Sequence, residues 1–272
     1  MSNKNILNKI KTINLVCFSP TGTSKKTIEN IAKGMGVNDV KLIDLTLSEN
    51  TKDIKFSDED FVIFGMPVYG GRIPITGVKR LKKLTSENTL SAIVVVYGNR
   101  AYEDALLELK NIVMELKFKP VAGGAFIGEH SFSSTELPIG HGRPDQQDDL
   151  DAISFGEKIM DKIGKIRGID DCSIIEVPGN FPYKDKMPPS KAAPSTNNDI
   201  CTMCESCATV CPVNAIQYKD EVITDNDKCI LCCACVRICP DGARILDIPP
   251  LLEKIKALSE NCKDPKKVEI FI

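Results

Sequence analysis

Short apolar runs alternate with amphipathic segments along the first 166 residues of the chain. Five mainly apolar runs predict strands, at residues 12–18, 39–45, 60–65, 91–97 and 120–128. Between them, apolar residues recur every three or four positions and predict helices at residues 28–35, 74–84, 105–116 and 150–166. Gly34 and Gly36 are expected to stop the first helix. Strands that alternate with helices predict an α/β fold with a doubly wound, five-stranded parallel sheet.

The pattern changes after residue 166, which predicts four parts. Residues 1–166 form the α/β domain, whose first ten residues are polar and predict a loosely packed arm. Residues 167–199 are rich in Pro, Gly, Ser and Asn and predict an extended, fairly stiff linker. Residues 200–247 form a small cysteine-rich domain, and residues 248–272 predict a helix that packs on one of the domains, followed by a basic tail.

Composition narrows the function classes further. A chain of 272 residues with 42% hydrophobic residues suits two ordinary globular domains. The net charge of −2 gives no sign of a nucleic-acid partner. The first apolar run is too short for a secretion signal or a membrane span. Twelve cysteines without a sign of secretion fit a reducing compartment, so we expect a cytoplasmic protein with no membrane partner.

Two cysteine runs carry the most specific chemical signal in the chain. Residues 201–212 and residues 229–240 each read C-x2-C-x2-C-x3-C-P, at an offset of 28 residues. Three thiolates at this spacing allow one short loop to wrap three corners of an iron–sulfur cube, while the fourth ligand comes from elsewhere. A zinc site would instead need four ligands, usually as two separated pairs. A disulfide framework would suit a secreted protein. Both alternatives fit the repeat less well than clusters do.

Residues 200–247 resemble the bacterial 2[4Fe-4S] ferredoxin family in both motifs and in their spacing. The resemblance implies a small pseudo-twofold fold of short hairpins and helical turns that carries low-potential electrons. It also implies that the fourth cysteine of each run ligates the other cluster. One [4Fe-4S] cluster is then expected on Cys201, Cys204, Cys207 and Cys239. The other is expected on Cys229, Cys232, Cys235 and Cys211.

Two residues depart from the internal repeat. Cys233 is an extra thiol that breaks the two-residue spacing, and we interpret it as a non-ligand. Arg244 stands where Ile216 stands in the first half of the repeat. Arg244 either tunes the local electrostatic field or lies on the surface.

The loop between the first predicted strand and the first helix reads S-P-T-G-T-S, from residue 19 to residue 24. Its amides and the helix N-terminus would form an anion site, to which four side chains would add hydroxyl donors: Ser19, Thr21, Thr23 and Ser24. The loop lacks the lysine of a P-loop and the G-x-G-x-x-G pattern of dinucleotide-binding folds. A monophosphate is the simplest ligand, and a capped helix start is the alternative.

Five strand–helix units with this loop after the first strand resemble the flavodoxin family over residues 12–166. The resemblance implies that the loop, Gly22 included, holds the phosphate of FMN. It also implies that the loops after the third and fourth strands flank the flavin ring. The expected contacts are Pro67, Val68, Tyr69, Gly70, Gly71, Gly98, Asn99, Arg100 and Tyr102. Tyr69 and Tyr102 either stack on the ring or are ordinary aromatic residues at its rim.

The chain has two histidines, His130 and His141, and each is either a proton donor or an ordinary loop residue. Between residues 131 and 149 the sequence shows no structure signals, which favours a lid or a binding loop.

The expected cofactors are one FMN and two [4Fe-4S] clusters. The leading hypothesis is a cytosolic electron-transfer flavoprotein that passes low-potential electrons between the clusters and FMN, to or from redox protein partners. The alternative is an FMN-dependent reductase of a small molecule that uses the ferredoxin domain as its electron inlet. A redox sensor with structural clusters is a third hypothesis. A homodimer is compatible with each of them.

Overall fold

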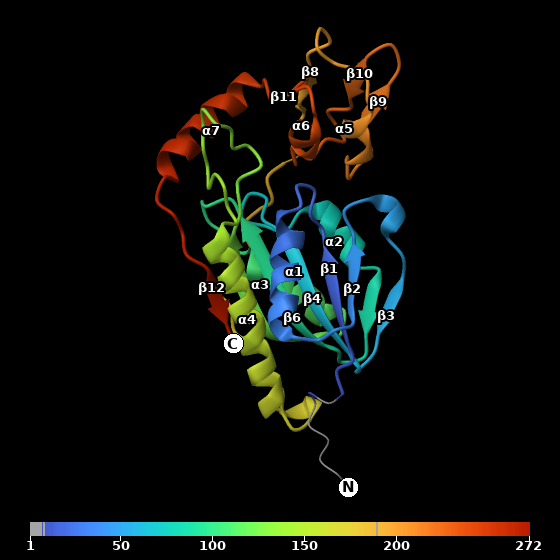
Figure 1. The fold of residues 1–272 in the computed structure, drawn as a ribbon, viewed down its shortest axis with the longest axis vertical. Coiled ribbons are helices and arrows are strands. Elements are labelled where there is room, and N and C mark those ends of the chain that lie inside the picture. Colours follow the sequence, from blue (N-terminus) through green and yellow to red (C-terminus); the bar gives the residue numbers. More distant parts are fainter. Residues whose placement is uncertain (1–6, 8, 189) are drawn as a thin grey trace.

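The computed structural model describes residues 7, 9–188 and 190–272 (Figure 1). The predicted N-terminal arm lies mainly outside the described residues. The central sheet has six strands in the order β12-β7-β6-β4-β1-β2. Their bounds are β1 Thr12–Cys17, β2 Val40–Asp44, β4 Asp60–Pro67, β6 Leu90–Tyr97, β7 Lys119–Ile127 and β12 Glu269–Phe271.

Five of these strands are parallel, as predicted. In chain order they are arranged 2-1-3-4-5, which is the flavodoxin-like order of doubly wound sheets. Cys17 at the end of β1 pairs with Asp44 on one side and with Gly65 on the other. The loops that follow β1 and β4 therefore leave the sheet at the same edge, next to one another.

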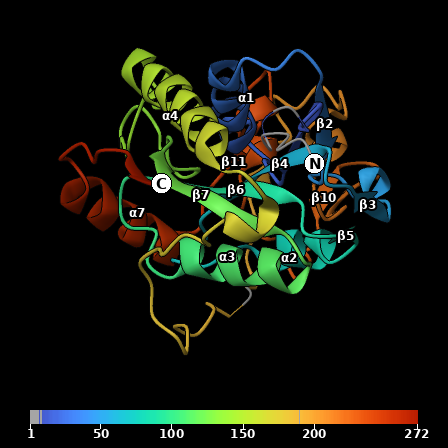
Figure 2. The ribbon, with the colours of Figure 1, turned by 90° about the horizontal axis from the view of Figure 1, so that it is seen from below.

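Helices cover both faces of the sheet (Figure 2). Helices α1 (Thr23–Met35) and α4 (Gln146–Lys165) lie on one face, and α2 (Ile75–Leu81) and α3 (Ala105–Glu115) lie on the other. Every residue of β1 and β6 is buried, because a parallel sheet between two helical layers has no solvent-facing side. A short parallel pair, β3 (Ile54–Phe56) and β5 (Leu84–Ser86), and a 3₁₀ turn at Ser48–Asn50 complete this domain.

Close contact between α1 and α4 depends on two glycines. A Cβ atom at Gly34 would lie 1.9 Å from the carbonyl oxygen of Ile153, and one at Gly156 would lie 2.0 Å from that of Ile31. Gly34 was expected to stop α1, but the helix continues to Met35, and Gly36 ends it in the left-handed conformation (φ 67°). Gly34 is thus a packing residue that fixes the helix carrying the residue 19–24 loop.

Two other helices differ from the prediction at their ends. α4 begins at Gln146 instead of residue 150, because Asp145 and Asp148 form a reciprocal capping box there. α2 ends at Leu81, and Leu84 is buried in β5 instead. Ile75, one of the apolar residues of the pattern that predicted this helix, is 48% exposed at the first turn of α2.

The cysteine-rich region lies over the edge of the sheet from which the loops after β1 and β4 emerge (Figure 1). It contains short elements: β8 Ser195–Thr196, α5 Ser206–Thr209, β9 Ile216–Tyr218, β10 Val222–Thr224, α6 Ala234–Ile238 and β11 Arg244–Ile245. β9 pairs with β10, and β8 pairs with β11, both antiparallel. Two short antiparallel pairs and two helical turns match the architecture that the ferredoxin resemblance implied.

The chain then returns to the α/β domain. Helix α7 (Pro249–Asn261) packs against the loop after β7 through a small apolar cluster around Ile139 and Ile255. β12 adds to the free edge of β7 in antiparallel direction, with Ile270 opposite Gly124. The predicted five-stranded sheet is therefore six-stranded, because this three-residue strand was too short to recognise in the basic tail.

Candidate metal centre and anion-binding loop

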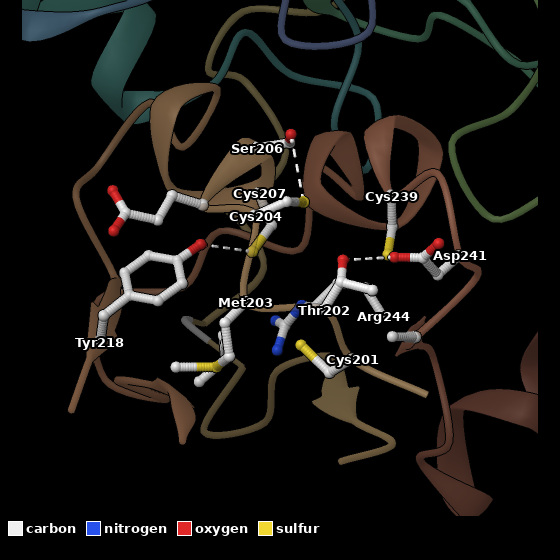
Figure 3. Close-up of a pocket in the computed structure, with 13 residues that line it drawn as sticks. Cys201, Thr202, Met203, Cys204, Ser206, Cys207, Tyr218, Cys239, Asp241 and Arg244 are labelled. Carbon is white, nitrogen blue, oxygen red and sulfur yellow. Dashed lines mark hydrogen bonds between the residues drawn. The ribbon is translucent and has the colours of Figure 1, made fainter. Parts of the chain in front are cut away.

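Four cysteines of the first predicted set line one pocket (Figure 3). This outer set comprises Cys201, Cys204, Cys207 and Cys239. Cys201 and Cys204 precede α5, Cys207 lies within it, and Cys239 ends α6. Among the described residues, no three Cys, His, Asp or Glu side chains are close enough to hold a single metal ion. The outer set instead lines one pocket, so the structure brings together four side chains predicted for one cluster.

The backbone of both cysteine runs has the same unusual conformation. Met203 and Glu205 have positive φ angles of 55° and 62°, and the residues 28 positions later, Leu231 and Cys233, have φ angles of 52° and 58°. Residues other than glycine seldom adopt this region, so its repetition marks the same tight loop in each half. Cys233 is the N-cap residue of α6 and adopts this conformation there. Its thiol donates to the carbonyl oxygen of Leu231 (3.7 Å).

The second predicted set is more deeply buried. This inner set comprises Cys211, Cys229, Cys232 and Cys235. Burial raises the pKa of the Cys232 thiol to about 12, and the nearby thiols of the other three members contribute to the rise. Three members of the inner set are buried, whereas Cys204 of the outer set is exposed. The inner set is therefore more enclosed than the outer set, which has one exposed member, Cys204. Which thiols bind which cluster stays a prediction.

The loop from Ser19 to Ser24 has the form of an anion site. Gly22, in the left-handed conformation (φ 82°), is the N-cap of α1, and no side chain caps it. The Ser19 hydroxyl accepts a hydrogen bond from the Lys25 amide (3.1 Å). Ser19 therefore satisfies one amide in the first turn of α1, as the helix-capping alternative predicts. Three amides have no hydrogen-bond partner among the residues that the structure describes: those of Thr21, Thr23 and Ser24. Free amides at the positive end of a helix suit a phosphate.

Tyr69 lies where the α/β domain meets the cysteine-rich region. It forms a tight turn with Arg72 through two backbone hydrogen bonds of 2.9 and 3.2 Å. Burial raises the pKa of Tyr69, and the charges of the Cys232 and Cys233 thiols raise it further, so the tyrosine lies within range of the charges of the inner set. The loop contains four other predicted flavin contacts. Pro67 ends β4, and Val68 packs on the core. Gly70 lies against the side chain of Met187, and Gly71 lies against that of Glu103.

Tyr102 has a different environment. Its ring is buried in the core with its centre 5.4 Å from that of Tyr97, and its hydroxyl donates to Glu269 of β12 (2.9 Å). A side chain held in this way belongs to the core. Stacking on the flavin, one of the two alternatives given for each tyrosine, therefore stays open for Tyr69 alone.

Asn99 and Arg100, two further predicted flavin contacts, are engaged within the chain. The buried Asn99 side chain donates to the carbonyl oxygen of Cys262 (2.7 Å) and accepts from the amide of Lys266 (2.9 Å). Arg100 pairs with Glu103 at 2.7 Å. Asn99 thus fixes the C-terminal tail against the loop after β6, a function that sequence patterns could not reveal because the partners lie more than 160 residues away.

Direct contacts join the two regions around the inner set. Arg80 of α2 donates to the carbonyl oxygen of Pro212 (2.5 Å), and Arg237 of α6 donates to that of His130 (2.8 Å). Ile230, next to Cys229, packs against the core between the sheet and helices α2 and α3. These contacts hold the inner set at the sheet edge where the predicted flavin loops lie.

The predicted linker is extended, but it is bound along the α/β domain. Asp104 accepts hydrogen bonds from the amides of Asn180 and Lys184, both at 2.8 Å. Arg72 lies over the ring of Tyr183 (4.5 Å) and forms a bidentate ion pair with Glu108 of α3 (2.8 and 2.9 Å). Sequence reasoning missed this buried pair, because one acidic residue in an amphipathic helix resembles part of a solvated face.

The two histidines differ in burial. The Nδ1 atom of His130 accepts from the amide of Phe132 (3.1 Å), which leaves the proton on Nε2. The ring packs so closely on Gly98 that a Cβ there would lie 2.4 Å from it. Burial, then the charges of Arg100 and Arg237, lower the pKa of His130 to about 4, so it is neutral at pH 7. His141 lies 3.0 Å from Glu129 and is exposed.

The half-buried, neutral His130 should make stability depend on pH. An unfolded chain takes up a proton below about pH 6.5, whereas the folded chain resists protonation until about pH 4. Stability should therefore fall by about 1–2 kcal/mol between pH 7.5 and pH 5.5 in anaerobic urea titrations. His130→Gln should remove this part of the dependence, and the exposed control His141→Gln should keep it. An unchanged slope in the His130→Gln protein would contradict the assignment.

Comparison with a protein-family model identifies the cysteine-rich region. Residues 194–217 and 222–245 match the 4Fe-4S binding domain, and each matched stretch contains one of the two cysteine runs. The C-terminal region is therefore a ferredoxin-type 4Fe-4S region, and two matched repeats are consistent with two clusters. Such a region supports a role in electron transfer. No curated protein matches the chain significantly.

Solved structures resemble the α/β domain at low identity. A flavodoxin from the domain Archaea is 16% identical, over 56% of this chain and 98% of its own, with a TM-score of 0.37. A flavodoxin from Streptococcus pneumonia TIGR4 is 15% identical, over 56% and 99%, with a TM-score of 0.38. The rubredoxin oxygen:oxidoreductase of Desulfovibrio gigas is 13% identical over 57% of this chain but only 36% of its own, with a TM-score of 0.39. The flavodoxin-like assignment rests on the strand order.

No helix within residues 7, 9–188 and 190–272 has the length and apolar character that crossing a membrane requires.

Proposed function

We propose that this chain is a cytoplasmic electron-transfer flavoprotein that passes low-potential electrons between two [4Fe-4S] clusters and FMN, to or from redox protein partners. The observation that carries the proposal is the contact of the inner set with the α/β domain: Ile230, next to Cys229, packs on the core, and Arg80 of α2 donates to the carbonyl oxygen of Pro212, next to Cys211. A [4Fe-4S] cluster supplies one-electron transfer and FMN supplies one- or two-electron transfer. Holding these sites in one chain replaces collisions between separate carriers with an intramolecular step.

The Ser19–Ser24 loop would hold the FMN phosphate. Three open amides at the positive end of α1 and the neutral hydroxyls around them fit a phosphate without a lysine. The flavin ring would lie near Tyr69. Gly98 is not included as a contact, because the ring of His130 occupies the space beside it. Asn99 and Tyr102 are not included in this site, because both side chains bond to the C-terminal segment.

The two cysteine sets would act in a fixed spatial order. The inner set lies against the Tyr69 loop, and its neighbour Ile230 packs on the α/β core. The outer set opens on the side of α5 and α6 that is turned away from the α/β domain (Figure 3). Cys235 of the inner set and Cys207 of the outer set are close enough for their charges to interact. Electrons would therefore pass between the outer set and the flavin by way of the inner set.

The surface around the outer set would receive a redox protein with a basic docking face. Three exposed apolar side chains lie here: Ile200, Met203 and Ile223. Four acidic residues line the adjoining pockets, against one lysine, Lys219: Glu205, Asp220, Glu221 and Asp241. An apolar centre within an acidic rim favours a partner of opposite charge, and the charges would mainly accelerate association.

The alternative, a reductase of a small molecule, rests on the long loop after β7. The structure fixes much of this loop. Ile139 is fully buried in the cluster with Ile255 of α7, and the Ser259 hydroxyl donates to the carbonyl oxygen of Pro138 (3.0 Å). A loop held in this way is a poor candidate for a lid, so the electron carrier is the better supported function.

The first test is the cofactor content of anaerobically purified protein. Absorbance spectra with iron, sulfide and flavin assays should give about eight irons and one FMN per chain, as two cubane clusters and one phosphate loop require. Eight irons without flavin would overturn the proposal for the α/β domain. One FMN without iron would overturn it for the cysteine sets.

A charge placed in the loop tests the phosphate site directly. Thr21 is exposed, and a carboxylate there would repel a phosphate while suiting the helix N-terminus. Thr21→Glu should weaken FMN binding about tenfold to a hundredfold, as expected when charged hydrogen bonds worth roughly 1.5–3 kcal/mol are lost. Thr85→Glu, an exposed change in β5, is the matched control. Equal FMN affinity in both variants, measured by fluorescence titration of flavin-free protein, would place the phosphate elsewhere.

A further inference from the structure

Arg244 is a buried cation in the middle of the cysteine-rich region. Its side chain is 2% exposed, although it occupies a position that sequence reasoning left open between a surface and a tuning role. The structure excludes the surface role. The corresponding position in the first half of the repeat is the apolar Ile216, so only one half carries this charge.

Neutral oxygen atoms hold the guanidinium in place. Its Nη1 atom donates to the Thr196 hydroxyl (2.6 Å), and its Nη2 atom donates to the Thr224 hydroxyl (2.7 Å) and the carbonyl oxygen of Pro194 (2.9 Å). No carboxylate pairs with Arg244 within the part of the chain that the structure describes. Burying a cation without a counter-charge is costly, so we expect an anion close to the guanidinium.

The remaining contacts of Arg244 point to that anion. Its Nη2 atom lies 3.8 Å from the Sγ atom of Cys235, in the inner set. Its side chain also lines the pocket of the outer set, into which the guanidinium projects (Figure 3). The Nε atom is buried and has no hydrogen-bond partner among the described residues. One guanidinium is thus shared between the two sets, with an N–H group still free to donate.

We infer that Arg244 is a shared counter-ion for both cluster sites, and that it raises the reduction potential of both clusters. The inference rests on the proposed function, because it requires clusters at the two cysteine sets. Thiolate ligands carry negative charge, and reduction adds one electron to a cluster without making or breaking a bond. A fixed buried cation favours the more negative, reduced state. Net charge and hydrogen bonds to sulfur are among the main determinants of cluster potential.

Potentiometric titration with dithionite, followed by EPR spectroscopy, tests this on the full-length protein. Arg244→Met should lower the reduced-to-oxidised ratio of both clusters about tenfold at a fixed potential, which equals about 59 mV for a one-electron couple. Arg244→Lys keeps the charge and should shift the ratio less. Lys219→Met removes the same charge from an exposed site of the same region and should leave the ratio nearly unchanged, since water screens it. Arg244→Met protein with eight irons and the parental ratio would overturn the inference.

A second measurement needs no change at Arg244. Protein labelled with ¹⁵N-arginine and reduced with dithionite should show ¹⁵N coupling to a reduced cluster in pulsed EPR spectra, and Arg237→Lys protein should retain that coupling. Absence of the coupling, or its loss with Arg237→Lys, would overturn the inference even if Arg244→Met does not fold. The iron assay separates a failure of the proposed function from a failure of the role of Arg244. Too little iron in the parent protein contradicts the proposed function. Full iron with no coupling contradicts only the role of Arg244.

Discussion

The Cys232→Ala protein is expected to keep about four of eight irons and its flavin, and to lose rapid electron exchange between that flavin and the remaining cluster. The reason is the proposed position of the inner set between the outer set and the α/β domain, on whose core Ile230 packs. After flash photoreduction of the flavin under anaerobic conditions, bleaching of the cluster absorbance should be fast in the parent protein. It should be slow in the Cys232→Ala protein.

Cys204→Ala is the matched control for this experiment, because Cys204 is the exposed member of the outer set. This variant should also keep about four irons, but its remaining cluster is the one beside the flavin loop. Photoreduced flavin should therefore reduce that cluster as fast as in the parent protein. Equally fast bleaching in both variants would mean that each cluster exchanges electrons with the flavin directly, and the proposed order would be wrong.

The parallel sheet could be predicted because its signals are local. Strands β1 and β6 are continuous apolar runs, and the helices between strands repeat apolar residues every three or four positions. β12 gave no such signal, because three residues in a polar tail pair only where the edge of β7 is free. The start of α4 was missed for a different reason: the Asp145–Asp148 capping box lies outside the apolar pattern that was used to locate the helix.

The cysteine sets could be predicted for a similar reason, since each loop carries its three thiols within seven residues. The flavin contacts are less local. Tyr69 and Tyr102 looked equivalent in sequence, but only the fold shows that one meets the inner set and the other bonds to Glu269. Arg244 could not be assigned from its position alone. Its burial depends on hydroxyls contributed by two separate strands, through Thr196 and Thr224.

The Glu108→Ala protein is expected to lose about 3–5 kcal/mol of stability, because it leaves a buried arginine without its partner. Glu108 accepts two hydrogen bonds from Arg72 and one from the amide of Ile73 (2.8 Å), and Lys186 lies 3.0 Å away. These groups connect α3 to the Tyr69 turn and to the bound segment around Tyr183. Urea titration of anaerobic protein, followed by far-UV circular dichroism, measures the loss.

Glu115→Ala is the matched control, because Glu115 is exposed on the same helix and should change stability by less than about 0.5 kcal/mol. The pH dependence gives a second check. Burial alone would raise the pKa of Glu108, but the hydrogen bonds from Arg72 and Ile73 outweigh it and hold the pKa below its usual range. The ion pair therefore contributes stability above about pH 4.3, the unfolded pKa, and this contribution is lost as pH falls through the lower folded pKa.

Since Arg72 also closes the Tyr69 turn, Glu108→Ala should slow electron exchange between flavin and clusters as well. A large loss of stability with unchanged exchange would show that the turn keeps its place beside Cys232 without the buried pair.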